Sequence, residues 1–205
     1  IQRYEFLIKI KDKIMTNEIL NIIHQRRSIG NLSLPMPNDA ELKSVLEAAM
    51  VAPDHKQLKP WRFWVLTGET LIEFGQVLLS AAEHEAASCG EILDEVAIKK
   101  ILNMPLRAPM IIVIATEYQY HKKVPPFEQL LSAGAVAQNM LLALESLGYR
   151  SVWRTGPLCN TPEVKDYFGV TKQNTICGLI YTGSSSVQMP DRETVDLSDY
   201  VEYRQ

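Results

Sequence analysis

The stretch "PMIIVIATEY", residues 109–118, restricts the fold of this chain more than any other, because its Ile and Val residues follow one another without polar alternation. A strand with one face in water alternates apolar and polar side chains, whereas a strand covered on both faces is a continuous apolar run. The sequence therefore predicts a central strand here, in a sheet whose two faces both lie against other elements.

Other segments predict the partners of that strand. Aromatic or β-branched runs favour further strands, and apolar residues at helical spacing favour helices. Asn38 with Glu41 three residues later is a capping box, so a helix begins there and is ended by Pro53. The other expected helices are residues 17–27, 69–87, part of 88–105, 128–148 and 161–169, and the other expected strands are residues 61–68, 149–153 and 176–183.

Single residues mark several ends of these elements. Asn17 is a good cap for the first helix, which is expected to end near Arg27. Gly148 is expected to end the long helix, and Thr161 is expected to cap the short helix that Gly169 stops. The result is a mixed α and β chain around one sheet.

Length and composition predict one domain. The chain has 205 residues, of which 46% are hydrophobic, and can therefore bury a sizeable core. No repeat or linker divides it. Residues 1–14 mix charged and apolar side chains and are interpreted as an N-terminal extension of uncertain origin, which leaves residues 15–205 as a single domain.

Charge and cysteine usage argue against several classes of protein. A net charge of -3 and a pI near 5.9 are not those of a nucleic-acid binder. Nothing approaches the roughly 18 consecutive apolar residues of a membrane span, and the N-terminus lacks the uninterrupted apolar core of a signal peptide. The three cysteines are widely spaced and form no CxxC. We therefore expect a cytoplasmic protein with free thiols.

Arg26, Arg27 and Ser28 stand where the first helix is expected to end. Adjacent residues on a helix point about 100° apart, so one guanidinium must approach the body of the protein, where it needs an anionic partner. A phosphate group suits that fork, and the Ser hydroxyl adds a hydrogen bond. The alternative is two arginines that interact favourably with a helix C-terminus.

Two further clusters offer binding groups. Asp54, His55 and Lys56 follow a helix and precede a strand, where they form either a ligand site or a solvated loop with His55 stacked on Trp61. "WRT", residues 153–155, ends a strand with an indole, a cation and a hydroxyl. These side chains line a flat aromatic ligand or, equally, are a core Trp beside a surface Arg.

Several common motifs are absent. There is no GxGxxG, no Walker A motif and no GxSxG elbow. The four histidines are scattered without HExxH or paired-ligand spacing, so no metal site is predicted.

Five segments in this order resemble the nitroreductase family, specifically its YdjA-like subgroup, over roughly residues 17–187. They are "RRSIGNLSLPMP", "APDHKQLKPWRFWVL", "APMIIVIAT", "HKKVPPFEQLLSAGAVAQNMLLALESLGY" and "VWRTGPL". The resemblance implies an α+β, nitroreductase-like fold: a mixed central sheet flanked by helices, in an intertwined homodimer. It also implies one FMN per subunit, bound at the subunit interface.

The resemblance also implies which residues bind FMN. Arg26, Arg27 and Ser28 match the segment that binds the phosphate and ribityl chain. His55, with Val51 one helical turn earlier, matches a contact from the partner subunit or the interface; close relatives can offer a basic residue at position 51, whereas Val51 can make only an apolar contact or a backbone bond. Trp153, Arg154 and Thr155 match the third FMN segment, with Thr155 in place of the usual serine.

The small residues of helix 129–148 are implied to lie at the centre of the dimer. One end of that helix corresponds to a stretch sometimes assigned to the nicotinamide nucleotide; its residues are Ala143, Leu144, Glu145, Ser146, Leu147 and Gly148.

The implied activity is transfer of hydride from NADH or NADPH, by way of flavin N5, to nitroaromatic, quinone or similar acceptors in a ping-pong sequence. The chemistry belongs to the cofactor, so no catalytic side chain is predicted. Two alternatives remain: an FMN-binding module with little turnover, which sequesters or senses flavin, and a metal-dependent hydrolase that uses Asp54 and His55.

Overall fold

The structure, a computed structural model, describes residues 17–204. The N-terminal extension expected at residues 1–14 lies outside this range. The centre of the molecule is a four-stranded sheet in the order β1-β2-β4-β3. Its strands are β1 Trp61–Thr67, β2 Met110–Thr116, β3 Arg150–Arg154 and β4 Ile176–Gly183.

Strand β2 confirms the prediction from its apolar run, because all seven of its residues are buried. The three strand pairs of the sheet are antiparallel. A parallel pairing is added by an isolated bridge between Ser28 and Ser151, which attaches the segment after the first helix to strand β3. The four strands thus form an antiparallel sheet where a mixed sheet was expected, and the parallel contact is limited to this bridge outside the named strands.

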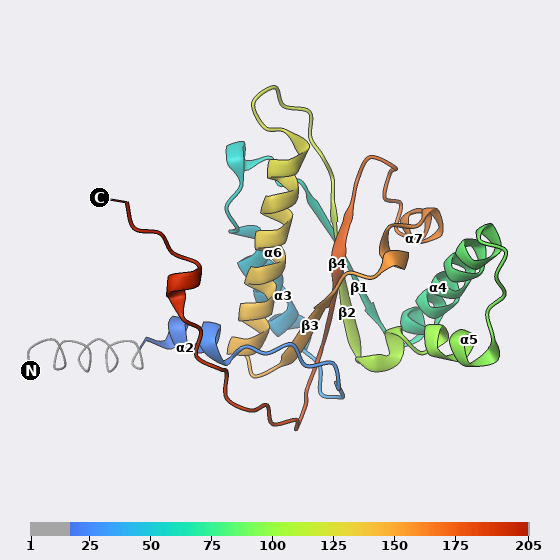
Figure 1. The fold of residues 1–205 in the computed structure, drawn as a ribbon, viewed down its shortest axis with the longest axis horizontal. Helices are drawn as coiled ribbons and strands as arrows, with labels where there is room; N and C mark the ends of the chain where they lie inside the picture. Colours follow the sequence, from blue (N-terminus) through green and yellow to red (C-terminus); the bar gives the residue numbers. More distant parts are fainter. Residues whose placement is uncertain (1–16, 205) are drawn as a thin grey trace, which may run out of the picture.

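Helices cover both faces of the sheet (Figure 1). On one face lie α2 Glu18–Gln25, α3 Asp39–Met50 and α6 Pro126–Ser146. On the other face lie α4 Glu69–Ser88, α5 Glu95–Leu102 and α7 Pro162–Tyr167. Short 3-10 turns connect the larger elements: η1 His55–Gln57, η2 Pro105–Arg107, η3 Pro157–Asn160 and η4 Leu197–Asp199.

Alternate side chains of β2 divide the core into two apolar clusters. Ile111, Val113 and Ala115 pack in the cluster that contains α4 residues. Ile112 and Ile114 pack in the cluster that contains α3 and α6 residues. A strand sends successive side chains to opposite faces, so an unbroken apolar run fills both layers at once.

The predicted helix signals are largely confirmed. Asn38 and Glu41 form the expected capping box of α3, and the Asn17 side chain caps α2. Helix α2 ends at Gln25, two residues before the expected end. Thr161 occupies the N-cap position of α7, but its hydroxyl donates to the carbonyl oxygen of Leu158 (3.0 Å) and does not cap the helix. Between residues 17 and 204, no helix is both long and apolar enough to span a bilayer.

Candidate functional site

The end of α2 and strand β3, more than 120 positions apart in the sequence, lie side by side. The Ser28–Ser151 bridge joins them, and the backbone N–H of Ile29 donates to the carbonyl oxygen of Ser151 (3.1 Å). Two of the three segments predicted to bind a cofactor therefore meet at one edge of the sheet.

A cavity of about 430 Å³ opens where these segments meet. Its lining residues are Arg26, Ser28, Gln138, Leu141, Trp153 and Thr155. Four of the eight residues predicted to bind FMN therefore share one cavity. Among residues 17–204, no hydrogen bond or ion pair involves the Arg26 guanidinium, which leaves it free for an anion.

Trp153 is held in a fixed orientation at this cavity. Its indole N–H donates to the carbonyl oxygen of Cys177 (3.1 Å), across on strand β4. The next residue, Gly178, has a φ of +147°, and a Cβ there would collide with the indole ring. A glycine at this bulged position of β4 therefore leaves the space that the indole occupies.

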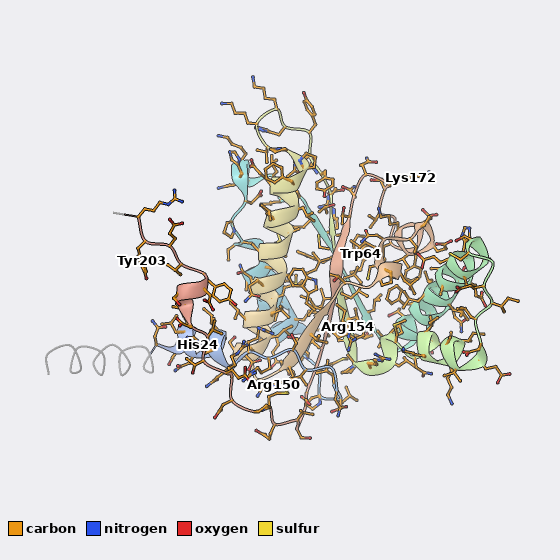
Figure 2. The ribbon with its side chains drawn as sticks, viewed as in Figure 1. His24, Trp64, Arg150, Arg154, Lys172 and Tyr203 are labelled. Atoms are coloured by element: carbon orange, nitrogen blue, oxygen red, sulfur yellow. The ribbon has the colours of Figure 1, made fainter. Side chains whose placement is uncertain are left out.

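Arg154 lies on the other face of the sheet, because it follows Trp153 in a strand (Figure 2). It lines a mainly apolar cavity of about 330 Å³, with Thr155 at the boundary between the two cavities. Its guanidinium carbon is 5.2 Å from the centre of the Tyr181 ring, and its Nε is buried without a partner. A buried guanidinium nitrogen without an acceptor is costly, so the geometry favours a polar ligand here.

Sequence reasoning missed the residues that surround Arg154. A Cβ on Gly30 would lie 2.7 Å from Nη2 of Arg154, so the glycine makes room for the guanidinium. Burial raises the pKa of Tyr181 to about 12, although the charge of Arg154 opposes that shift. Burial also raises the pKa of Cys159, whose thiol lines the same cavity and stays protonated at neutral pH. Because side chains alternate along a strand, the sequence could have predicted that Arg154 and Trp153 point to opposite faces. No sequence pattern indicated a role for Gly30.

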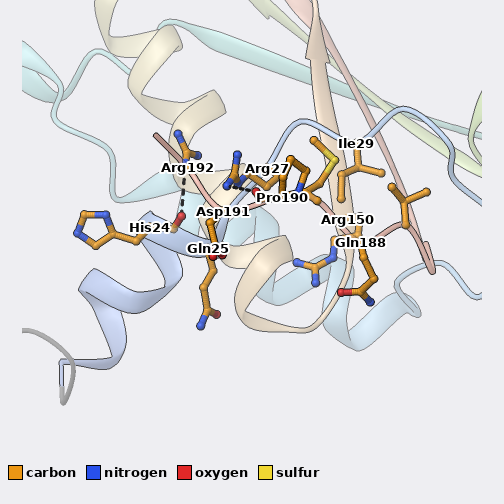
Figure 3. A pocket seen from close by; sticks show the side chains of 11 residues that line it. His24, Gln25, Arg27, Ile29, Arg150, Gln188, Pro190, Asp191 and Arg192 are labelled. Atoms are coloured by element: carbon orange, nitrogen blue, oxygen red, sulfur yellow. Dashed lines mark hydrogen bonds between the residues drawn. The ribbon is translucent and has the colours of Figure 1, made fainter. Parts of the chain in front are cut away.

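Arg27 turns away from Arg26 and binds the C-terminal segment. Its Nη2 donates to the carbonyl oxygen of Pro190 (2.7 Å), and Arg192 donates to two carbonyl oxygens at the end of α2 (Figure 3). The cavity of about 380 Å³ between these segments also includes Arg150, which pairs with Glu145. The three arginines of this cavity thus already have acceptors, and it is the weaker candidate for anion binding.

His55 and Val51 lie apart from both cavities. The imidazole Nδ1 of His55 is 2.7 Å from a carboxylate oxygen of Glu128. The Val51 side chain is 78% exposed, which is unusual for a valine. One copy of the chain does not bring these two residues to Arg26 and Trp153.

The segment from Ala143 to Gly148 ends helix α6 and contacts neither cavity next to Trp153. Leu144 is fully buried in the core, and Glu145 pairs with Arg150. These two residues therefore have partners within the chain, whereas Ser146, Leu147 and Gly148 are exposed.

Asp54 and His55 do not form a metal site in the described part of the chain. The Asp54 carboxylate accepts a hydrogen bond from the backbone N–H of Lys59 (2.6 Å). No group of three or more His, Cys, Asp or Glu side chains that could hold a metal ion occurs among residues 17–204.

Comparisons of the sequence with known proteins agree on one family. The model of the nitroreductase family matches residues 23–184. The chain is 37% identical over 180 residues to the protein named "Putative NAD(P)H nitroreductase YdjA" from Escherichia coli K12, a match that covers 85% of this chain and 95% of the relative. A nitroreductase relative from Haemophilus influenzae is 34% identical over 189 residues, which cover 91% of this chain and 99% of the relative.

Solved structures show the same fold. A nitroreductase-like protein from Bacillus cereus superimposes with a TM-score of 0.77 at 23% identity, over 92% of this chain and 96% of the other. A nitroreductase with bound FMN from Bacteroides fragilis superimposes with a TM-score of 0.68 at 21% identity, over 92% and 100% of the two chains. The architecture of helices around an antiparallel sheet is therefore nitroreductase-like, as the motifs predicted.

Proposed function

Because this chain belongs to the nitroreductase family, we propose that it is an FMN-dependent oxidoreductase. It would take hydride from NADH or NADPH and pass it to a small-molecule acceptor, such as a nitroaromatic or a quinone, in a ping-pong sequence. The observation that carries the proposal is the cavity that gathers Arg26, Ser28, Trp153 and Thr155. Thr155 also lines the second cavity, in which Nε of Arg154 has no partner within the described part of the chain.

The residues of this site fit FMN, whose phosphate, ribityl chain and flat ring need three different environments. Arg26, whose guanidinium has no partner among residues 17–204, would bind the phosphate group. The exposed hydroxyls of Ser28 and Thr155 would accept and donate hydrogen bonds along the ribityl chain. Trp153 supplies an aromatic wall, and its indole N–H is already bonded to Cys177.

Arg154 adds a positive charge to the mainly apolar cavity next to Thr155. Bound FMN would supply the redox chemistry by accepting and releasing two electrons as hydride. A cation in a low-dielectric wall favours negative charge on a neighbouring group, so Arg154 would raise the reduction potential of a bound flavin. We propose no side chain as acid or base.

We further propose that the chain acts as a homodimer. Apolar side chains are exposed on the face formed by α2, α3 and α6, among them Leu131 (68%), Phe127 (62%) and Val51 (78%). Such a patch is typical of an interface. In a dimer, His55 and Val51 would approach the cavity of the partner subunit, as the family resemblance implies.

Two smaller proposals concern the chain as a whole. Residues 15–205 are proposed to fold as one domain around the single described sheet. A cytoplasmic location is proposed because Cys89, Cys159 and Cys177 are all free thiols, one of them exposed. Nicotinamide binding at residues 143–148 stays a proposal that only the exposed end of the segment, Ser146 to Gly148, could serve, because Leu144 and Glu145 are buried.

An absorption spectrum tests the proposed function. The purified protein would be incubated with FMN, freed of excess cofactor, and titrated anaerobically with NADH and with NADPH. Bound flavin that bleaches with either nucleotide is expected, and the comparison identifies the donor. Bound flavin that stays oxidised would favour a binding module with little turnover. Failure to retain any FMN would refute the site assignment.

A further inference from the structure

The first turn of α6 fixes two loops that are far apart in the sequence. Gln129 is buried and bonds to both backbone groups of Gln119, with its Nε2 also donating to the carbonyl oxygen of Val124. Its neighbour Glu128 contacts the other loop, through His55. The helix start thus holds the loop that leads into α6 and the loop that follows α3.

Glu128 is well placed to hold an imidazole. It is the third residue of α6, where the amide groups of a helix N-terminus stabilise a carboxylate. An ionised carboxylate can only accept hydrogen bonds. The 2.7 Å contact to Nδ1 of His55 therefore requires the proton of the neutral ring to lie on Nδ1.

The His55 loop is held in a strained conformation. Lys56, Gln57 and Lys59 have φ angles of +69°, +54° and +48°, in the left-handed region that side chains disfavour. Asp54 accepts two hydrogen bonds that close the loop: its carboxylate accepts from Lys59 N–H and its carbonyl oxygen accepts from Gln57 N–H. Three such residues in one short loop persist only where the surroundings determine the conformation, and strain of this kind clusters at functional sites.

We propose that Glu128 is a positioning residue for His55: it locks the neutral imidazole as the Nδ1–H tautomer and presents the lone pair of Nε2 as a hydrogen-bond acceptor. The His55 side chain is 48% exposed, and among residues 17–204 Glu128 is the residue that bonds to the ring. This inference rests on the proposed function, in which His55 reaches the flavin of the partner subunit. FMN offers donors that match an acceptor, namely the ribityl hydroxyls and the N3–H of its ring.

The chain contains a matched control for this pair. Nδ1 of His84 on α4 lies 2.6 Å from a carboxylate oxygen of Glu163 on α7. This second His–Glu pair is partly exposed and lies on the opposite side of the sheet from α6 (Figure 1). E163A removes a contact of the same chemistry without touching the proposed site.

Nitrogen NMR of the FMN-free protein tests the tautomer directly. The protein would carry 15N-labelled histidine, and the pH would be chosen from an NMR titration of His55 so that its ring is neutral. The wild-type ring is then expected to carry its proton on Nδ1. In E128Q the amide can accept or donate, so a mixture of tautomers is expected with the ring still in place. A wild-type ring protonated on Nε2, or an unchanged tautomer in E128Q, would overturn the proposal.

A double-mutant cycle on FMN affinity tests the consequence. H55A, E128A and the double variant are each expected to raise the Kd for FMN by about tenfold, with no further loss in the double variant. E163A is expected to leave the Kd unchanged. If E128A raised the Kd for FMN by the same factor in the wild type and in H55A, Glu128 would act on folding and not through the imidazole. A wild type that binds no FMN refutes the proposed function itself, whereas the NMR result stands independently.

Discussion

At the scale of single residues, Arg26 and Arg27 are neighbours with different partners. R26A is expected to raise the Kd for FMN by about tenfold to a hundredfold, because a guanidinium bond to a charged group contributes about 1.5–3 kcal/mol. The measurement is quenching of FMN fluorescence on titration with FMN-free protein. R27A is the matched control: its guanidinium binds the carbonyl oxygen of Pro190, so it should affect FMN affinity less than threefold. Equal losses in both variants would contradict this division.

A second prediction at this scale concerns Gly178, whose missing side chain leaves room for the indole of Trp153. G178A would force a Cβ into the indole and the backbone of Arg154 at a φ of +147°. The expected loss in the free energy of unfolding is about 2–3 kcal/mol, from overpacking and backbone strain together. Urea unfolding followed by tryptophan fluorescence would measure it. G156A has open space and a φ of -93°, and should be nearly neutral; a neutral G178A would show that Trp153 can move without cost.

How much of the site could be predicted differs from residue to residue. Arg26 and Arg27 diverge as expected, but not through helix geometry: α2 ends at Gln25, and Arg26 already has a non-helical ψ of 127°. Arg27 is turned toward Pro190, 163 positions away. Trp153, Arg154 and Thr155 were grouped by adjacency, and the strand separates the first two onto opposite faces. Gly30 and Tyr181 were missed because their contacts with Arg154 are long-range.

At the scale of elements, the capping box of α3 also links two helices. The backbone N–H of Asn38 and the hydroxyl of Tyr149, just beyond α6, both donate to the Glu41 carboxylate. The bond from Asn38 lowers the pKa of Glu41 most, followed by the bond from Tyr149. Glu41 also raises the pKa of Tyr149. The same carboxylate therefore begins one helix and fixes the end of another.

The lowered pKa of Glu41 predicts how stability depends on pH. The folded state holds the carboxylate ionised more strongly than the unfolded state, whose pKa is near 4.5. The stabilisation is therefore present above that pH and is lost as the pH falls through the folded-state pKa. Y149F should be less stable than the wild type at about pH 7, and this difference should shrink at about pH 3. Urea unfolding at both pH values measures it.

Y200F is the control for that comparison, because Tyr200 is exposed in the C-terminal segment. It should follow the wild-type curve at every pH. A Y149F deficit that stays constant down to about pH 3 would mean that lost packing, and not the bond to Glu41, causes it.

Elements were easier to predict than contacts because their signals are local. The apolar run of β2 and the capping box of α3 are each read within a few residues, and both are confirmed. Thr161 shows the limit: it stands at the N-cap of α7, but its hydroxyl donates to the carbonyl oxygen of Leu158 and accepts no hydrogen bond from a helix N–H. The antiparallel order of the strands depends on long-range pairing, for which local patterns carry no signal.

At the scale of the whole molecule, the proposed homodimer would account for two features of a single copy. His55 and Val51 match a cofactor-binding pattern yet lie away from the Arg26 cavity. The apolar side chains of Phe127, Leu130 and Leu131 are exposed on α6, on the face that carries α2 and α3. A second copy packed on that face would bury these side chains and bring His55 toward the cavity. Both features are explained by one assembly.

This reasoning gives a coupled prediction for assembly and cofactor binding. The wild type is expected to sediment as a dimer, and L131E is expected to shift it to monomer, because burial of a charge in an apolar interface is costly. If the dimer completes the site, L131E should lose FMN in parallel with the dimer, and raising the protein concentration should restore both.

I92E is the control: Ile92 is 96% exposed in the loop between α4 and α5, beyond the opposite face of the sheet, so it should stay dimeric with FMN bound. Sedimentation velocity recorded at protein and flavin wavelengths follows both quantities at once. A monomeric L131E that keeps its flavin would separate the two, and FMN binding would then have to be explained by Arg26, Ser28, Trp153 and Thr155 of a single copy.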